Sequence, residues 1–450
     1  MNTSVALNKV PSQIDTPKSN RIRSIVGACA GNLVEWYDFF AYAYTSIYFA
    51  SAFFPSGDST SQLLATAAIF GIGFFMRPLG GWLFGWLADT HGRKISMVVS
   101  VFMMCGGSLM IALLPTYAMI GLAAPALLLV ARLLQGLSVG GEYGTGATYL
   151  SEISTKGNRG FYGSFQYFTI IAGQLSALLV LIVLQSIFST EELKAWAWRI
   201  PFFIGALAAV VVVYLRRALQ ETLSEEAMHR KEAGSLTALL QHKRALILVL
   251  AFTMGGSLYF YTYSTYMQKF LVSTLKFPPS TASLIMSVAL TIFMFIQPIF
   301  GMLSDRIGIK TNMLLFTGLA TLATAPLLHT LSTVSSPYVA FALVVCGLVI
   351  ASFYTPIAGL VKAELFPAEV RALGVGLPYA IANALFGGTA EYIALTLKLQ
   401  GTEHYYFYYV TAVLCVSLAA SLWMPDLRIK GYLDGTGEIE KAPPPSLKVA

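Results

Sequence analysis

Long hydrophobic runs alternate with short polar segments from about residue 24 to about residue 424 of this chain. A helix needs about 20 consecutive apolar residues to cross the hydrocarbon core of a bilayer. Twelve runs approach that length, and they predict twelve membrane-spanning helices at residues 24–52, 61–87, 95–115, 121–150, 160–188, 197–217, 245–270, 280–303, 311–330, 338–363, 374–398 and 405–424. The predicted fold class is therefore an all-α integral membrane protein.

The composition supports a membrane environment and argues against most other classes of protein. Hydrophobic residues make up 56% of the chain and charged residues 11%, whereas soluble proteins carry about 25% charged residues. The formal net charge of +7 is explained by basic cytoplasmic loops, so we predict no nucleic-acid partner. The sequence contains no P-loop, no cluster of metal-ligating residues and no nucleophile motif. We therefore predict no cofactor, no metal and no enzymatic activity.

A charged interior segment divides the chain into two halves. Residues 218–244 hold the longest charged stretch between the apolar runs. They are predicted to form a cytoplasmic linker between six-helix bundles at residues 24–217 and 245–424, with a disordered arm at 1–23 and a tail at 425–450. Lysine and arginine are concentrated in the loops on one side of the predicted helices, which places both termini in the cytoplasm. The arm lacks the apolar core of a signal peptide.

Two sets of loop residues are repeated at nearly the same separation. The first set is Gly85, Asp89, Gly92 and Lys94. The same residue types recur at the same spacing at Gly301, Asp305, Gly308 and Lys310. A second pair, seven residues apart in each half, is Glu152 and Arg159, then Glu364 and Arg371. Two homologous halves in an apolar chain indicate a transporter built from repeats, with its substrate site near the membrane midplane. The repeated loops are predicted to act as gates.

Several charged side chains lie inside the predicted helices of the first half. Each costs at least about 2.5–3.5 kcal/mol unless it is paired or hydrated, so each is a functional candidate. The polar residues at membrane depth in this half are Asn32, Glu35, Asp38, Arg77, Arg132, Gln135 and Glu142. Asn32, Glu35 and Asp38 follow three-residue steps and share one helix face. The second half offers fewer such groups.

These residue types match an anionic substrate that moves together with protons. A guanidinium binds a carboxylate through two parallel hydrogen bonds, so two buried arginines suit a dianion. A carboxylate becomes easier to protonate when its arginine partner is taken by substrate. The predicted substrate-binding residues are Arg77, Arg132, Gln135, Asn32, Tyr263 and Asn383, and the predicted proton-coupling residues are Glu35, Asp38 and Glu142.

A structural role is the alternative for each of these charges. In that interpretation Arg132 ties helices together through backbone carbonyls, and Glu35 only neutralises Arg132. Lys269 and Lys362 lie near the ends of predicted helices. Both lysines are expected to extend toward the lipid headgroups, as long basic side chains do near helix ends.

The repeated loop and the fourth helix resemble known sequence motifs. Residues 85–94 resemble the signature between the second and third helices of the major facilitator superfamily, with Thr90 where a basic residue is common. Residues 132–140 resemble the fourth-helix motif of its proton symporters. Residues 31–42, 75–94, 131–152 and 198–202 are similar to the metabolite:proton symporter family, and 263–272 and 362–392 to its alpha-ketoglutarate permease branch. The resemblance covers about residues 21–424.

The resemblance implies the major facilitator fold, in which two pseudo-symmetric six-helix bundles rock about a central site and the proton gradient supplies the energy. It implies that Asp89 caps the eleventh helix near Gly374, where a negative charge is favourable, and that Asp305 is the looser equivalent. The gating residues it implies are Asp89, Arg93, Asp305, Glu152, Arg159, Glu364 and Arg371, with Glu152–Arg159 and Glu364–Arg371 as latches. The alternative is that these loops only set orientation in the membrane.

The expected function is import of alpha-ketoglutarate or a similar dicarboxylate with protons, by a monomer in a bacterial-type inner membrane. Citrate, shikimate, proline and betaine are alternative substrates. A long charged C-terminal coiled coil would favour an osmolyte, and this tail has none. A non-transporting membrane sensor would need an added soluble domain, for which residues 218–244 are too few. A membrane enzyme is less favoured still, because no catalytic side chains cluster.

Overall fold

The computed structural model describes residues 18–55, 59–216, 221–224, 228, 233–433 and 437. Most of the predicted arm at 1–23, part of the predicted linker at 218–244 and most of the predicted tail at 425–450 lie outside these residues. The helix α1 (Lys18–Phe53) begins within the predicted arm. The apolar pattern misses this start because lysine and arginine are good helix formers but are not hydrophobic.

All regular secondary structure in the described part of the first half is helical. After α1 it contains α2 (Ser59–Phe75), α3 (Arg77–His91), α4 (Arg93–Leu113), α5 (Tyr117–Ile120), α6 (Ala123–Ile153), α7 (Arg159–Ile187), α8 (Thr190–Ala195), the 3₁₀ turn η1 (Ala197–Arg199) and α9 (Ile200–Arg216). A short helix, α11 (Leu236–Leu239), follows within the predicted linker.

The second half repeats the pattern with more interruptions. It contains α12 (Lys243–Tyr261), η2 (Thr262–Tyr266), α13 (Met267–Ser273), α14 (Pro279–Ile307), α15 (Ile309–Ser332), α16 (Pro337–Ala351), η3 (Thr355–Ile357), α17 (Ala358–Ala363), η4 (Ala368–Val370), α18 (Arg371–Ala382), η5 (Asn383–Gly387), α19 (Ala390–Leu399), α20 (His404–Trp423) and α21 (Leu427–Lys430). The segments η2 and η5 are π-helical turns, which often mark functional positions.

Ten helical segments of the described residues are long and apolar enough to cross a membrane. The predicted spans at 24–52 and 61–87 are not among the ten. The span at 61–87 is divided at Met76 into α2, with 17 residues, and α3, with 15 residues. Pro78 explains the division, because proline lacks the N–H that a helix interior needs and favours the first turn of a new helix.

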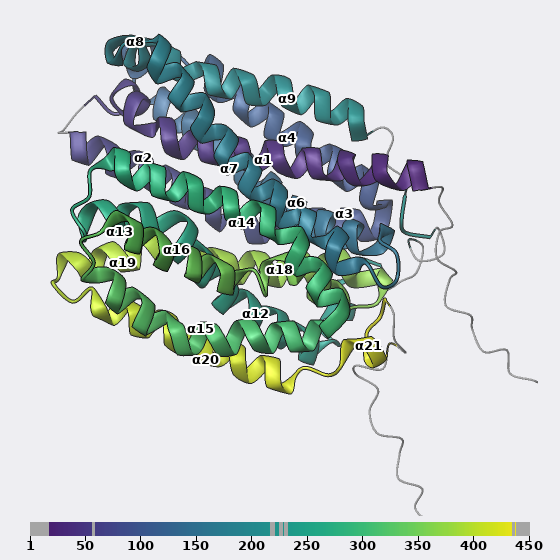
Figure 1. Cartoon of the computed structure of the whole chain (residues 1–450). Helices are drawn as coiled ribbons and strands as arrows, with labels where there is room; N and C mark the ends of the chain where they lie inside the picture. The colour runs from purple at the N-terminus through teal and green to yellow at the C-terminus, as the bar shows by residue number, and fades with distance from the viewer. Residues whose placement is uncertain are drawn as a thin grey trace, which may run out of the picture.

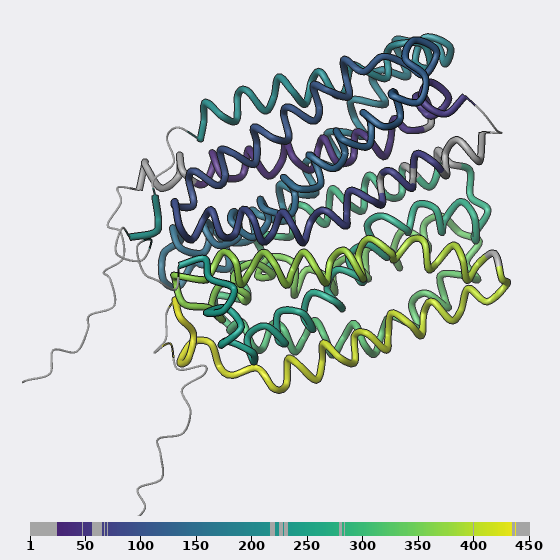
Figure 2. Tube along the Cα trace, turned by 180° about the vertical axis from the view of Figure 1, so that it is seen from behind, coloured from purple at the N-terminus to yellow at the C-terminus, as the bar shows by residue number. Residues whose placement is uncertain are grey.

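The two halves pack side by side with their helices running in the same general direction. The first half lies above and the second half below in Figure 1, and Figure 2 shows the same order from behind. The halves meet where α7 packs along α14 and where α3 and α6 pack along α18. At the last contact a Cβ atom on Gly144 would lie 2.5 Å from Cα of Gly376. Glycine is therefore required there for the backbones to approach.

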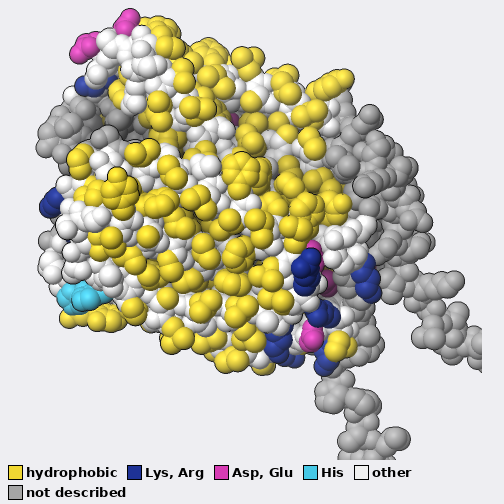
Figure 3. Space-filling view, in the orientation of Figure 1, with side chains coloured by type: hydrophobic (Ala, Val, Ile, Leu, Met, Phe, Trp, Pro, Cys, Tyr) yellow, Lys and Arg dark blue, Asp and Glu magenta, His cyan; other side chains and the backbone are white. Residues whose placement is uncertain are grey.

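The surface of the molecule has a broad apolar belt and a group of basic side chains near one end. Hydrophobic side chains cover the broad face between the two ends in Figure 3, and Lys and Arg side chains gather near one end. On α9, for example, Leu207, Val210 and Val211 are exposed. We call the end at which α1 begins and α20 ends the gate end; it also holds the α3–α4 junction and the start of α18. A belt of this kind suits contact with lipid.

Candidate functional site

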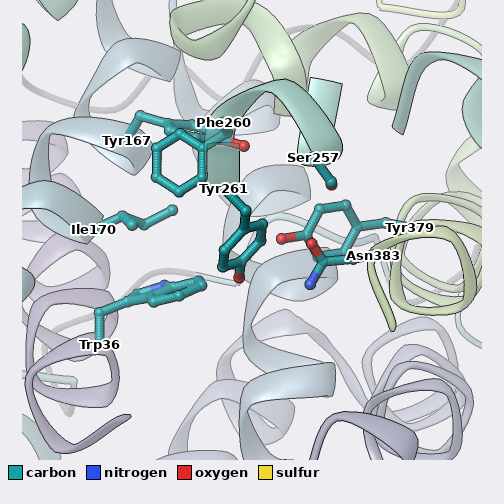
Figure 4. Close-up of a pocket in the computed structure, with 8 residues that line it drawn as sticks. All are labelled: Trp36, Tyr167, Ile170, Ser257, Phe260, Tyr261, Tyr379 and Asn383. Carbon is teal, nitrogen blue, oxygen red and sulfur yellow. The ribbon is translucent and has the colours of Figure 1, made fainter. Parts of the chain in front are cut away.

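A small pocket lies between the two halves. It is lined by Trp36, Tyr167 and Ile170 of the first half and by Ser257, Phe260, Tyr261, Tyr379 and Asn383 of the second half (Figure 4). Asn383 is fully buried at the start of η5, and neither atom of its amide has a hydrogen-bond partner among the described residues. An unmade hydrogen bond at a buried group costs about 1–3 kcal/mol. The amide is therefore positioned to bind a ligand.

Arg77 places a buried positive charge beside this pocket, next to Tyr261, although it is not itself among the lining residues. Its guanidinium carbon lies 3.8 Å from the ring centroid of Phe74 and 4.7 Å from that of Phe39. Nη1 lies 3.5 Å from the Tyr261 hydroxyl, and Nη2 has no hydrogen-bond partner among the described residues. Aromatic faces attract the cation but do not use its N–H donors. The guanidinium is thus held in place with donors left for an anion.

Arg132 and Gln135, also predicted to bind substrate, bind each other. Arg132 Nη1 donates to Gln135 Oε1 at 2.7 Å, and Gln135 Nε2 donates to Ser108 Oγ at 2.9 Å. The Arg132 guanidinium lies 4.2 Å from the ring centroid of Tyr42 and interacts with the charge of Asp38. Neither residue is among those that line the pocket of Figure 4. Their predicted role in binding stays a prediction.

Glu142 forms a buried ion pair that the sequence did not suggest. Its partner is Arg216 of α9, and Ser100 Oγ donates to Glu142 Oε2 at 2.7 Å. Both charged side chains are almost completely buried. Arg216 is the last residue of α9, but a helical side chain points toward the N-terminus of its helix, here back into the bundle. Gly31 leaves room for the guanidinium, since a Cβ atom there would lie 1.7 Å from Nη2.

Glu35 and Asn32 lie on one face of α1 but contact different helices, Glu35 on α6 and Asn32 on α7. Ser138 Oγ donates to Glu35 Oε1 at 2.6 Å, while Oε2 has no hydrogen-bond partner among the described residues. Asn32 Nδ2 donates to the Gln166 carbonyl oxygen at 2.8 Å and to Thr169 Oγ1 at 2.7 Å. Asn32 therefore joins α1 to α7 and is not among the residues that line the pocket. Glu35 keeps one oxygen available for a proton.

Tyr263, predicted to bind substrate, lies elsewhere than its neighbour Tyr261. Its ring centroid lies 4.7 Å from that of Tyr259, and it packs against Gly347 within the second half. Tyr261 lines the pocket instead. Residues two apart on a helix point to opposite sides, so only one of the two can line the pocket, and the sequence does not indicate which side faces it.

Two carboxylates join the halves at the gate end in matching ways. Asp89, at the end of α3, accepts hydrogen bonds from the backbone N–H groups of Ala372 at 3.1 Å and Leu373 at 2.9 Å, in the first turn of α18. Asp305 accepts from the N–H groups of Gly160 at 2.7 Å and Phe161 at 3.0 Å, in the first turn of α7. Each half therefore caps a helix of the other, and a helix N-terminus favours the negative charge.

The predicted latch pairs are rearranged across the boundary between the halves. Glu152 was paired with Arg159 from the sequence, but it contacts Arg371 of the second half at 2.7 Å and Arg93 at 3.2 Å. Arg93 also pairs with Asp89. The repeated loops face each other across the boundary between the halves, so an acid in one half meets a base in the other. The contact between Glu152 and Arg371 therefore links the two halves at the gate end.

The remaining two latch residues contact the chain beyond α21. Arg159 Nη1 donates to the Ser151 carbonyl oxygen at 2.9 Å, and Nη2 donates to the Leu433 carbonyl oxygen at 3.4 Å. Glu364 Oε2 accepts from the Leu433 N–H at 2.9 Å. The segment after α21 therefore bridges the two halves at the gate end.

Comparison with known proteins decides the family. Residues 28–390 match the family model for the Major Facilitator Superfamily. The chain belongs to this superfamily. It is 59% identical over 404 residues to the alpha-ketoglutarate permease of Escherichia coli (strain K12), covering 90% of this chain and 94% of that protein. It is 34% identical over 428 residues to the citrate-proton symporter of Salmonella typhi, covering 93% and 97%.

The solved structures agree with this fold. The proton:xylose symporter XylE superposes with a TM-score of 0.75 at 16% identity, covering 94% of this chain and 99% of that one. Identity at this level supports the fold and not the substrate. The family and these relatives are transporters, so the chain is a multi-pass membrane transporter and not an enzyme.

Proposed function

We propose that this chain is a secondary active transporter that imports alpha-ketoglutarate, or a closely similar dicarboxylate, together with protons. The observation that carries the proposal is Arg77, a buried guanidinium at a pocket between the halves, which forms no ion pair among the described residues. Asn383 adds an unpartnered amide to the same pocket. The 59% identity to an alpha-ketoglutarate permease supports the choice of substrate.

Transport proceeds by alternating access of two six-helix bundles with twelve membrane-spanning helices in all. The additional spans are α1 and the divided pair α2 and α3. The protein lies in a bacterial-type inner membrane. Its gate end and both termini face the cytoplasm, because basic side chains gather at the gate end (Figure 3). The working unit is a monomer without cofactor, and the proton gradient supplies the energy.

Protons are carried by buried carboxylates of the first half. Glu35 has an unpartnered oxygen, and Asp38 is buried close to Arg132. Glu142 is already neutralised by Arg216. We therefore rank Glu35 first and Asp38 second as proton carriers. Glu142 ranks third, because its protonation would break the ion pair with Arg216. Arginine partners that engage substrate leave such carboxylates easier to protonate.

Competition between organic acids tests the choice of substrate. In proteoliposomes with an imposed pH gradient, labelled alpha-ketoglutarate is expected to accumulate, and unlabelled dicarboxylates of similar length to compete. Citrate and proline are the informative competitors, because relatives at 34% and 32% identity are named as a citrate-proton symporter and a putative proline/betaine transporter. Stronger inhibition by either than by unlabelled alpha-ketoglutarate would assign the chain to that substrate instead.

The gate contact at Asp89 predicts a variant that separates binding from turnover. Asp89→Asn replaces an oxygen that accepts a backbone hydrogen bond by an N–H₂ group and removes the charge beside Arg93. We expect uptake to slow about 10-fold, since one charge-assisted hydrogen bond is lost, while purified protein binds alpha-ketoglutarate as the wild type does. Asp426→Asn, at an exposed helix cap, is the matched control. Loss of binding by a folded Asp89→Asn protein would contradict this role.

A further inference from the structure

Lys362 lies in a cage of tyrosine rings at the boundary between the halves. Its Nζ donates to Tyr143 Oη at 2.9 Å and lies 4.5 Å from the ring centroid of Tyr379 and 5.8 Å from that of Tyr354. The side chain is fully buried. The expectation that Lys362 extends toward the lipid headgroups is wrong, because α6, α18 and the segment between α16 and η3 surround it.

The ammonium in this cage has no negative partner among the described residues. Its contacts are one phenol oxygen and three aromatic rings, and no carboxylate is among them. Aromatic rings attract a cation, but an unpaired charge at membrane depth is still unfavourable. A methionine would fill the same space without that cost. A lysine at this position therefore points to an anion that binds there during the transport cycle.

The cage lies directly behind one wall of the pocket. Tyr379 both contacts the Lys362 ammonium and lines the pocket in Figure 4. Its ring is stacked on that of Tyr143, with the centroids 3.5 Å apart and the planes at 9°. Arg77 reaches the same pocket at Tyr261. Arg77 of the first half and Lys362 of the second half therefore each contact a residue that lines the pocket.

We propose that Lys362 is the second cationic ligand for the dicarboxylate, and that it receives one carboxylate when the Tyr143–Tyr379 stack separates. The inference rests on the proposed function and names the group of the second half that recognises the dianion. Tyr143 belongs to the first half, whereas Lys362 and Tyr379 belong to the second. Movement of the halves relative to each other therefore breaks the hydrogen bond that holds the ammonium.

This arrangement links opening of the gate end to the presence of substrate. When the stack separates with the pocket empty, the ammonium loses its phenol partner and gains nothing. With a dianion held by Arg77, the second carboxylate replaces the phenol oxygen and forms a stronger, charge-assisted contact. Opening is thus easier for the loaded protein than for the empty one.

Selectivity between matched acids tests the role of Lys362. Alpha-ketoglutarate and 2-oxopentanoate share a five-carbon 2-oxo acid skeleton and differ by the second carboxylate. Dissociation constants for both are measured on purified protein from tryptophan fluorescence, since Trp36 lines the pocket. We expect Lys362→Gln, which keeps a donor for Tyr143 Oη, to reduce the preference for alpha-ketoglutarate about 10- to 100-fold. Affinity for 2-oxopentanoate is expected to change little.

Lys269→Gln is the matched control for this experiment. Lys269 is 56% exposed and pairs with Glu391, outside the pocket, so the variant is expected to keep the wild-type preference. Lys362→Met is a second neutral variant, and its two dissociation constants are measured instead if Lys362→Gln does not fold. A folded neutral variant that keeps the preference, or loses both ligands equally, overturns the proposal. No preference in the wild type would instead contradict the proposed function itself.

Discussion

Arg77→Lys is expected to lower kcat/KM for alpha-ketoglutarate uptake about 10- to 100-fold, although the positive charge is retained. An ammonium cannot offer a carboxylate two parallel N–H donors in one plane, as a guanidinium does. The rings of Phe74 and Phe39 are positioned against the planar group and not against a point charge. The loss is measured as initial uptake rates over a range of substrate concentrations in proteoliposomes.

Arg132→Lys is expected to lose most transport as well, because it breaks the contact with Gln135 beside Asp38. Arg199→Lys is the control for both variants. Arg199 follows α8, where it donates to the Leu114 carbonyl oxygen outside the pocket. Normal uptake by both Arg77→Lys and Arg132→Lys would remove these arginines from the substrate site and leave them a structural role.

Glu35→Gln is expected to abolish accumulation driven by a pH gradient while substrate exchange continues. Glutamine has the shape of the protonated acid, and its carbonyl oxygen still accepts from Ser138 Oγ. The variant is therefore fixed in the neutral state and cannot release the proton. The ratio of internal to external substrate should fall to about one under a gradient that the wild type uses, and the pH dependence of exchange should flatten.

Uphill accumulation by Glu35→Gln with the wild-type pH profile would make Glu35 structural. Asp38→Asn is then the next variant to test, since Asp38 is fully buried and interacts with Arg132. Glu142→Gln is less informative, because it leaves Arg216 as an unpaired buried charge. Breaking a buried ion pair in this way costs about 3–5 kcal/mol of stability, so lost transport would not identify a proton carrier.

The sequence predicted the arrangement of the helices better than their internal breaks. Apolar runs locate spans because lipid demands about 20 hydrophobic residues for each helix. The division of α2 from α3 at Met76 and the π-helical turns η2 and η5 do not change that average composition. Nor does composition show which side of a helix faces the pocket: Tyr261 lines it, whereas Tyr263 was predicted to bind substrate.

The buried charges were singled out from the sequence, but their partners were not. A charge within an apolar run is conspicuous because it is costly. Its partner depends on how helices distant in the sequence pack, as for Glu142 with Arg216 and for Glu152 with Arg371. Lys362 was expected near a helix end because of its position, and its side chain is nevertheless buried, as is that of Arg216.

The central claim is that a dicarboxylate and protons cross the membrane together. The most direct test adds alpha-ketoglutarate to proteoliposomes without an imposed gradient and follows external pH and labelled uptake at the same time. Substrate addition is expected to make the outside more alkaline at a rate proportional to uptake in the wild type, and Glu35→Gln is expected to show no such change. Substrate uptake by the wild type without proton movement would contradict it.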